Sequence, residues 1–162
     1  MATIKKDMYL VLDLDGVLIT TPPWKPDQIA SDGYSEFNKS CTENLNRLLT
    51  LVEFKIWLSS TRRTTKTLTE FNTLFKNRGI KTQITGFLPQ YAECKNRKEE
   101  ILKFLTEFKI SDFLIIDDDK TLNGLENTIK NKLILTELTK GFNSEKLKEA
   151  TEKIKNCSQH RV

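Results

Sequence analysis

Residues 8–18 read MYLVLDLDGVL, and this stretch decides which kind of fold the sequence can form. Its first five residues are all apolar, which is typical of a strand buried on both faces of a parallel sheet. Two carboxylates, Asp13 and Asp15, follow at once, and Gly16 comes next. Ligands of parallel sheets bind beyond the carboxyl ends of the strands. The stretch therefore predicts a buried strand that brings two acids to a binding edge.

Further apolar runs along the chain repeat this pattern. They cover residues 54–58, 113–116 and 133–135, with a weaker strand candidate at residues 80–87. Amphipathic stretches separate them, with apolar residues at helical spacing over residues 40–52, 68–75, 101–108 and 147–154. Strands that alternate with helices predict an α/β fold, in which a mostly parallel five-stranded sheet carries helices on both faces.

Two local signals mark helix ends. Asn96 followed by Glu99 predicts a capping box at the start of the helix whose apolar face covers residues 101–108. Gly79 follows the stretch at residues 68–75 and is expected to cap the carboxyl end of that helix.

The polar residues at the strand ends are the main functional signal. The strand at residues 54–58 ends in Ser59 and Ser60, and the strand at residues 113–116 runs into Asp117 and Asp118. Right-handed crossovers would bring these ends and Asp13 to one edge of the sheet.

Carboxylates gathered in a small site repel one another, and Mg²⁺ is the natural compensation because it prefers a few carboxylates, water and phosphate oxygens. An aspartate can also attack phosphorus as a nucleophile. The alternative is that each acid merely caps a turn or a helix. The occurrence of both acidic clusters with a serine-rich strand end favours a site.

The segment at residues 19–38 breaks the alternation of strands and helices. It contains three prolines and the aromatics Trp24, Tyr34 and Phe37, which predict an ordered flap beside Asp13 and Asp15. The aromatic rings could stack on a nucleobase, or they could pack the flap onto the sheet. A basic cluster, Arg62, Arg63 and Lys66, could steer phosphate or form a solvated helix face.

Composition narrows the class of protein. The 162 residues suit one domain, and 26 Lys+Arg against 22 Asp+Glu give a net charge of +4, which permits a phosphate-bearing partner. The three cysteines form no CxxC pair, so we expect a cytoplasmic protein without disulfides. A run of about 18 apolar residues is missing, which argues against a membrane span. The single histidine, His160, makes mechanisms that need a buried histidine base improbable.

The string DLDGVL at residues 13–18 resembles the first motif of the haloacid dehalogenase-like (HAD) phosphatase superfamily. The resemblance covers roughly residues 9–154 and implies a three-layer Rossmann-like sandwich. It also implies that Asp13 is the nucleophile, and that Asp15 is the general acid and base and gives a backbone carbonyl to Mg²⁺. The string LIIDDDK resembles the fourth motif, which makes Asp118 the main metal ligand, with Asp117 assisting and Asp119 a weaker candidate.

The second and third motifs leave alternatives open. The strand end resembles the second motif, whose hydroxyl holds phosphate; the alignment favours Ser60, and strand length leaves Ser59 possible. The third motif needs a basic residue near the start of the helix before the acidic strand. Arg97 and Lys98 both match, and Lys95 is an outlier.

A small subgroup of capless bacterial and phage proteins is particularly similar. The matching segments here are Trp24-Lys25-Pro26, Asp32-Gly33-Tyr34, Ser59 to Arg63, Arg97 to Ile101 and Ile116 to Asp119. The subgroup commonly has Trp where this chain has Arg62, and its pattern places the third motif on Arg97. We therefore expect one HAD-like domain over residues 1–162, with a flap at about residues 19–38 and no folded cap.

The resemblance implies a Mg²⁺-dependent phosphomonoester hydrolase that works through an aspartyl-phosphate. Without a cap the site is open, which suits nucleotides, nucleic-acid ends or other large phosphorylated partners, with Trp24 and Tyr34 on the flap. The order of the motifs separates the chain from bacterial receiver domains, whose acidic pair and phospho-acceptor lie on other strands. The alternative is a non-catalytic HAD-fold module that binds phosphate or protein. The sequence leaves the substrate and the oligomeric state open.

Overall fold

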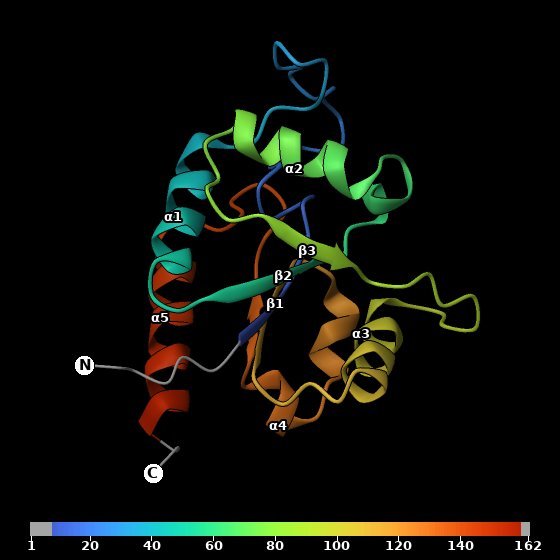
Figure 1. Ribbon diagram of the computed structural model, residues 1–162, viewed down its shortest axis with the longest axis vertical. Helices are drawn as coiled ribbons and strands as arrows, with labels where there is room; N and C mark the ends of the chain where they lie inside the picture. Colours follow the sequence, from blue (N-terminus) through green and yellow to red (C-terminus); the bar gives the residue numbers. More distant parts are fainter. Residues whose placement is uncertain (1–7, 160–162) are drawn as a thin grey trace.

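A computed structural model describes residues 8–159 and shows a twisted sheet with helices packed around it (Figure 1). The strands are β1 (Met8–Leu12), β2 (Phe54–Leu58), β3 (Ile84–Phe87), β4 (Phe113–Asp117) and β5 (Leu133–Leu135). They lie in the order β3-β2-β1-β4-β5, and every pairing is parallel. The predicted five-stranded α/β sheet is confirmed, and it is parallel throughout.

The register of the central strands places the polar strand ends side by side. Leu12 of β1 pairs with Leu58 of β2 and with Ile116 of β4. The backbone N–H of Asp13 donates to the carbonyl of Ile116 at 3.0 Å, and that of Ser59 donates to the carbonyl of Leu12 at 2.8 Å. The first residues beyond these strands therefore leave the sheet at one level.

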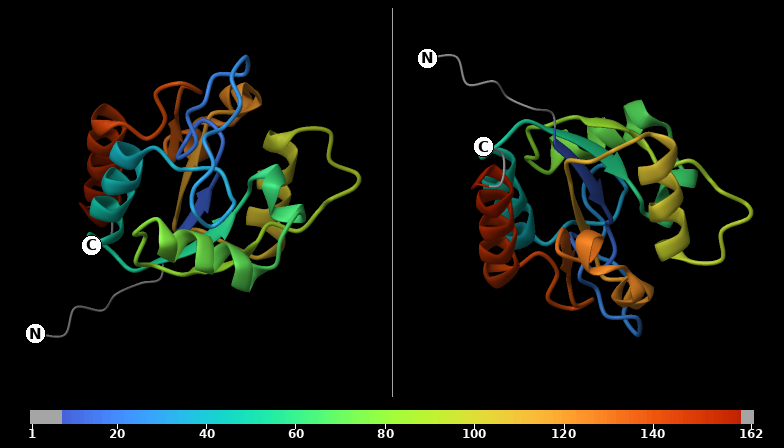
Figure 2. Two further views of the ribbon diagram at one scale, coloured as in Figure 1. Left: turned by 90° about the horizontal axis from the view of Figure 1, so that it is seen from above. Right: turned by 90° about the horizontal axis from the view of Figure 1, so that it is seen from below.

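Helices cover the sheet on both faces, as two views along the vertical axis of Figure 1 show (Figure 2). One face carries α1 (Lys39–Leu49), α2 (Leu68–Asn77) and α5 (Ser144–Gln159), and the other carries α3 (Arg97–Glu107) and α4 (Asn127–Lys130). Alternate residues of β1 divide between the two cores: Leu10 and Leu12 face the first, and Val11 faces the second. This period of two explains why the strand is apolar at every position.

The ends of several elements differ from the sequence prediction. β3 begins only at Ile84, and α4 and the short 3₁₀ helices η1 (Thr61–Thr64) and η2 (Lys120–Gly124) were not predicted. Asn96 does cap α3, with its side chain accepting from the N–H of Glu99. The Glu99 carboxylate, however, accepts from the N–H of Lys95, so the predicted reciprocal box does not form.

The complete capping box lies instead at the start of α2, where Thr67 and Glu70 bond reciprocally. Gly79 follows the end of α2 with a φ of +81°, a conformation that glycine adopts without strain, as its predicted capping role requires.

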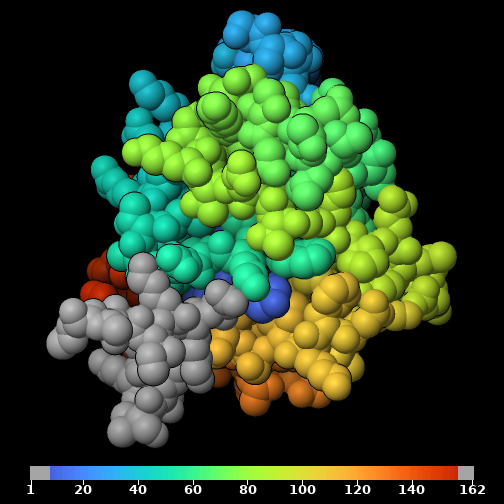
Figure 3. Space-filling view, in the orientation of Figure 1, coloured from blue at the N-terminus to red at the C-terminus, as the bar shows by residue number. Residues whose placement is uncertain are grey.

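The segment at residues 19–38 forms the flap, which stands out beyond α2 at the top of the molecule (Figure 3). An antiparallel bridge joins Ile29 to Ser35 within it. Arg78, at the end of α2, holds the flap by donating to Asp32 at 2.6 and 3.0 Å and to the Ser35 carbonyl at 2.9 and 3.2 Å. The ring of Phe37 packs edge-on against Phe75.

No separate cap domain is evident within residues 8–159, in agreement with the prediction. Over the same range, every helix is too short or too polar to span a bilayer.

Candidate active site

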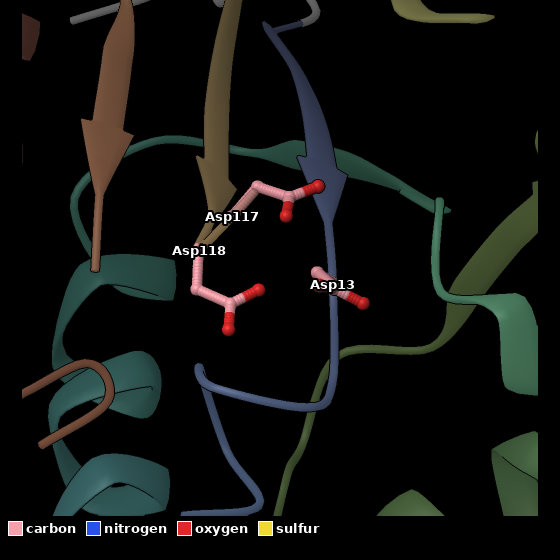
Figure 4. Close-up of side chains that lie close together, drawn as sticks. All are labelled: Asp13, Asp117 and Asp118. Carbon is pink, nitrogen blue, oxygen red and sulfur yellow. The ribbon is translucent and has the colours of Figure 1, made fainter. Parts of the chain in front are cut away.

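Three aspartates meet at the carboxyl end of the central strands (Figure 4). Asp13 follows β1, Asp117 ends β4, and Asp118 is the next residue. One carboxylate oxygen from each lies within 4.8 Å of the others. Asp13 and Asp117 are buried, and Asp118 is partly exposed. Strand order and register therefore build a compact acidic cluster, which we call the aspartate cluster.

The turn after Asp13 is shaped around Asp118. Gly16 has a φ of +78°, and a Cβ atom there would lie 2.1 Å from Oδ2 of Asp118. A side chain at this position would thus collide with the cluster. Glycine serves the tight turn and also leaves the space that the Asp118 carboxylate occupies.

Crowding of the carboxylates changes their acidity. Burial, and then the charge of Asp117, raise the pKa of Asp13 well above its ordinary range. The same two causes raise the pKa of Asp118 to about 6. Both shifts mean that the cluster resists holding all of its negative charge without a compensating cation.

Arg97 is the cation that the structure places inside this cluster. Its Nη1 lies 2.6 Å from Oδ2 of Asp117 and 3.6 Å from Oδ2 of Asp13. Burial works against the charge of Arg97, but Asp117 and Asp13 more than offset it and raise the pKa of the guanidinium. One guanidinium against three carboxylates leaves an excess of negative charge, so these carboxylates could hold a divalent metal ion.

The two serines after β2 point in different directions. Oγ of Ser59 lies 3.5 Å from Oδ2 of Asp117 and accepts from Nη1 of Arg97 at 3.4 Å. Oγ of Ser60 instead accepts from the N–H of Arg62 at 3.1 Å and caps η1. Of the two hydroxyls, that of Ser59 is the one that contacts the aspartate cluster.

The three basic candidates for the third motif also separate in space. Arg97 is the first residue of α3 and enters the aspartate cluster. The backbone N–H of Lys98 donates to Thr121, and its side chain runs beside Gly124 of η2. Lys95 is exposed. Asp119 lies outside the cluster, because its carboxylate caps η2 through the N–H of Thr121.

The interpretation of Arg62 and Arg63 as a solvated helix face is wrong. Arg63 is buried and donates to the carbonyls of Ser59, Ser60 and Leu88 at 2.8–3.1 Å. It thereby fixes the backbone at the end of β2. Arg62 is half-buried and pairs with Asp15 at 2.8 Å. The contacts of Arg63 with Leu88 and of Arg62 with Asp15 have no local signal, because the partners lie 25 and 47 positions away.

The flap aromatics differ in exposure. Trp24 is 76% exposed, whereas Tyr34 packs edge-on against Phe71 and receives a hydrogen bond from Arg62 at 3.4 Å. Tyr34 and Phe37 thus pack the flap onto α2, and Trp24 leaves its ring on the surface. Sequence reasoning missed Asp27 and Ser35, flap residues that contact Arg62 at 3.0 and 3.3 Å.

A parallel sheet with this strand order, an aspartate cluster at its carboxyl edge and a flap between the first strand and the first helix agree with the HAD superfamily. The family model for the HAD domain in Swiss Army Knife RNA repair proteins matches residues 9–147, and the chain belongs to this family. Membership supports a hydrolase of phosphoesterase type. A comparison with curated proteins gives no match.

Proposed function

We propose that this chain is a Mg²⁺-dependent phosphomonoester hydrolase that acts on phosphorylated ends of RNA. The observation that carries the proposal is the meeting of Asp13, Asp117 and Asp118 with the Ser59 hydroxyl and the Arg97 guanidinium. In this proposal, one small volume would hold the nucleophile, the hydrogen-bond donors to the phosphate and the metal ligands of one reaction.

In the proposed reaction a carboxylate oxygen of Asp13 attacks phosphorus in line, and the bond from phosphorus to the leaving oxygen breaks. Asp15 gives its proton to that oxygen. Water then attacks the aspartyl-phosphate while Asp15 accepts a proton from it, which returns the Asp13 carboxylate. Ser59 and Arg97 donate hydrogen bonds to the equatorial phosphoryl oxygens, and their contacts with the cluster support this choice over Ser60 and Lys98.

The donor set suits Mg²⁺. The ligands would be the carboxylates of Asp13 and Asp118 and the carbonyl of Asp15, with Asp117 assisting. All are hard oxygen donors, and the raised pKa values of Asp13 and Asp118 mark a site where a divalent charge relieves repulsion. When bound, the ion neutralises charge that would otherwise repel the phosphate from the nucleophile.

Four observations support the proposed substrate. The described chain lacks a separate cap, so a large substrate can approach the cluster. The family that the chain belongs to is described as a domain of RNA repair proteins. An exposed aromatic at Trp24 and a net charge of +4 suit a polyanion with unstacked bases.

The free thiols of Cys41 and Cys94 agree with a reducing cytoplasm.

The test is phosphate release from matched RNA oligonucleotides carrying a 3′-phosphate or a 5′-phosphate, from the same DNA sequences, and from a small sugar phosphate. Each substrate is measured with Mg²⁺ and with EDTA. We expect Mg²⁺-dependent release from at least one RNA end, at higher kcat/KM than from the sugar phosphate. Absence of release from every substrate would instead support the non-catalytic binding module.

A further inference from the structure

The guanidinium of Arg62 donates two parallel hydrogen bonds to the carboxylate of Asp15. Nε lies 2.8 Å from Oδ2 and Nη2 lies 2.9 Å from Oδ1. A paired fork of this kind fixes the plane of the carboxylate as well as its position. Asp15 follows β1, whereas Arg62 lies in η1 after β2, 47 residues away, so the pair joins two neighbouring strand ends.

The flap in turn fixes Arg62. Nη2 lies 3.0 Å from Oδ2 of Asp27, and Nη1 contacts Oγ of Ser35 at 3.3 Å and the hydroxyl of Tyr34 at 3.4 Å. Oγ of Ser35 donates to Asp27 at 2.6 Å, which completes a closed network. These contacts and the two to Asp15 occupy the donors on every nitrogen of the guanidinium. These contacts hold the Arg62 guanidinium in place, and it has little capacity left to donate hydrogen bonds to a substrate phosphate.

We propose that Arg62 is a positioning residue that orients Asp15 to take the proton from the water that hydrolyses the aspartyl-phosphate. This inference rests on the proposed function. In that step the water oxygen bonds to phosphorus, and the bond from phosphorus to Asp13 breaks. Its electron pair returns to the Asp13 carboxylate, and the water proton passes to Asp15.

The geometry of Asp15 suits this role. An ionised carboxylate has about four lone-pair sites, and the fork of Arg62 uses two of them. The others stay open to water, because the Asp15 side chain is 44% exposed. The next residue, Gly16, lies directly against Asp118, so the backbone beside Asp15 is in contact with the aspartate cluster.

A substrate with an activated leaving group separates this step from the first one. 2,4-Dinitrophenolate leaves phosphorus without a proton, so kcat/KM for its phosphate reports formation of the aspartyl-phosphate, and kcat reports its hydrolysis. A side chain that acts only on the second step changes kcat and leaves kcat/KM alone.

The experiment compares the wild-type protein with Arg62→Ala and Arg62→Lys on 2,4-dinitrophenyl phosphate in the presence of Mg²⁺. For Arg62→Ala we expect kcat to fall about ten- to hundredfold, since loss of orientation by ~1 Å can cost ~10²-fold. KM should fall in parallel, keeping kcat/KM within about threefold. A burst of dinitrophenol should approach one per active site. Arg62→Lys keeps the charge without the fork and should show the same split with a smaller loss.

The control is Arg47→Ala, which removes an exposed arginine in the last turn of α1, outside the flap. We expect it to change neither kcat nor kcat/KM. The inference is overturned if Arg62→Lys leaves kcat unchanged, if kcat and kcat/KM fall together, or if Arg47→Ala produces the same split. A wild-type protein that cannot hydrolyse the substrate contradicts the proposed function itself.

Discussion

Nη1 of Arg97 lies 2.6 Å from Oδ2 of Asp117, and both side chains are buried at the carboxyl end of β4. Removal of one member of a buried ion pair leaves the other charge uncompensated, at a cost of ~3–5 kcal/mol. Arg97→Ala should therefore lower the free energy of unfolding by about that amount, measured by urea denaturation in EDTA.

The control for this variant is Arg47→Ala, which removes an exposed arginine in the last turn of α1 and should cost less than ~0.5 kcal/mol. Equal losses in both variants would mean that Arg97 contributes no more than a surface charge.

Asp13→Asn should abolish turnover of an aryl phosphate while the protein stays folded. The amide keeps the shape of the side chain but is a poor nucleophile, and one like charge leaves the aspartate cluster. Without Mg²⁺, the variant should melt at or above the wild-type temperature, because burial disfavours the charged form of Asp13. Turnover is followed by phosphate release, and folding by circular dichroism.

Asp119→Asn provides the matched control for Asp13→Asn. Its carboxylate caps η2 rather than facing the cluster, and asparagine caps helices equally well. We expect its turnover to stay within a few-fold of wild type. Hydrolysis at the wild-type rate by Asp13→Asn would show that another group is the nucleophile.

Mg²⁺ should raise the melting temperature, and Asp118→Ala should remove most of the rise. Binding to the native state alone adds roughly 2.7 kcal/mol at a hundredfold excess of ligand over Kd. Thermal melts with and without Mg²⁺ measure the effect, and added EDTA should reverse it. Equal shifts in both proteins would exclude Asp118 as a principal ligand.

The metal-free protein should lose stability as the pH rises from about 4 to 6. The pKa of Asp118 is raised from 3.8 to about 6, so in this range the native state binds more protons than the unfolded state, and the free energy of unfolding falls with pH. Asp13 acts in the same direction. Asp27 and Asp32 have lowered pKa values, and their contributions change only below about pH 4.

Urea denaturation in EDTA at steps of pH measures this slope, and Asp118→Asn should flatten it. Stability that increases between pH 4 and 6 in the metal-free wild type would contradict the placement of Asp118 among like charges.

Trp24→Ala should raise KM for a phosphorylated RNA oligonucleotide and leave turnover of a small aryl phosphate nearly unchanged. Its ring is 76% exposed on the flap, and a lost base stack of ~1–3 kcal/mol corresponds to about five- to 150-fold in affinity. The measurement is kcat/KM on both substrates, after the melting temperatures have been compared. Equal losses on both would assign Trp24 to the structure of the flap.

The sequence by itself determined the strands and the positions of the acids that follow them. Residues 8–12 are apolar at every position, and residues 54–58 are apolar apart from Lys55, because helices cover both faces of the sheet. The bounds of these two strands could therefore be predicted from local pattern alone. The N-cap at Asn96 is equally local, since it depends on a residue three positions away.

The tertiary structure alone decided which polar groups meet. Ser59 and Ser60 are neighbours with the same chemistry, and only the register of β1 with β2 on one side and with β4 on the other brings the Ser59 hydroxyl beside Asp117. The pairing of Arg62 with Asp15 joins residues 47 positions apart through adjacent strands and the flap. Periodicity and capping act over a few residues, whereas ion pairs form between whichever groups the order of the strands brings together.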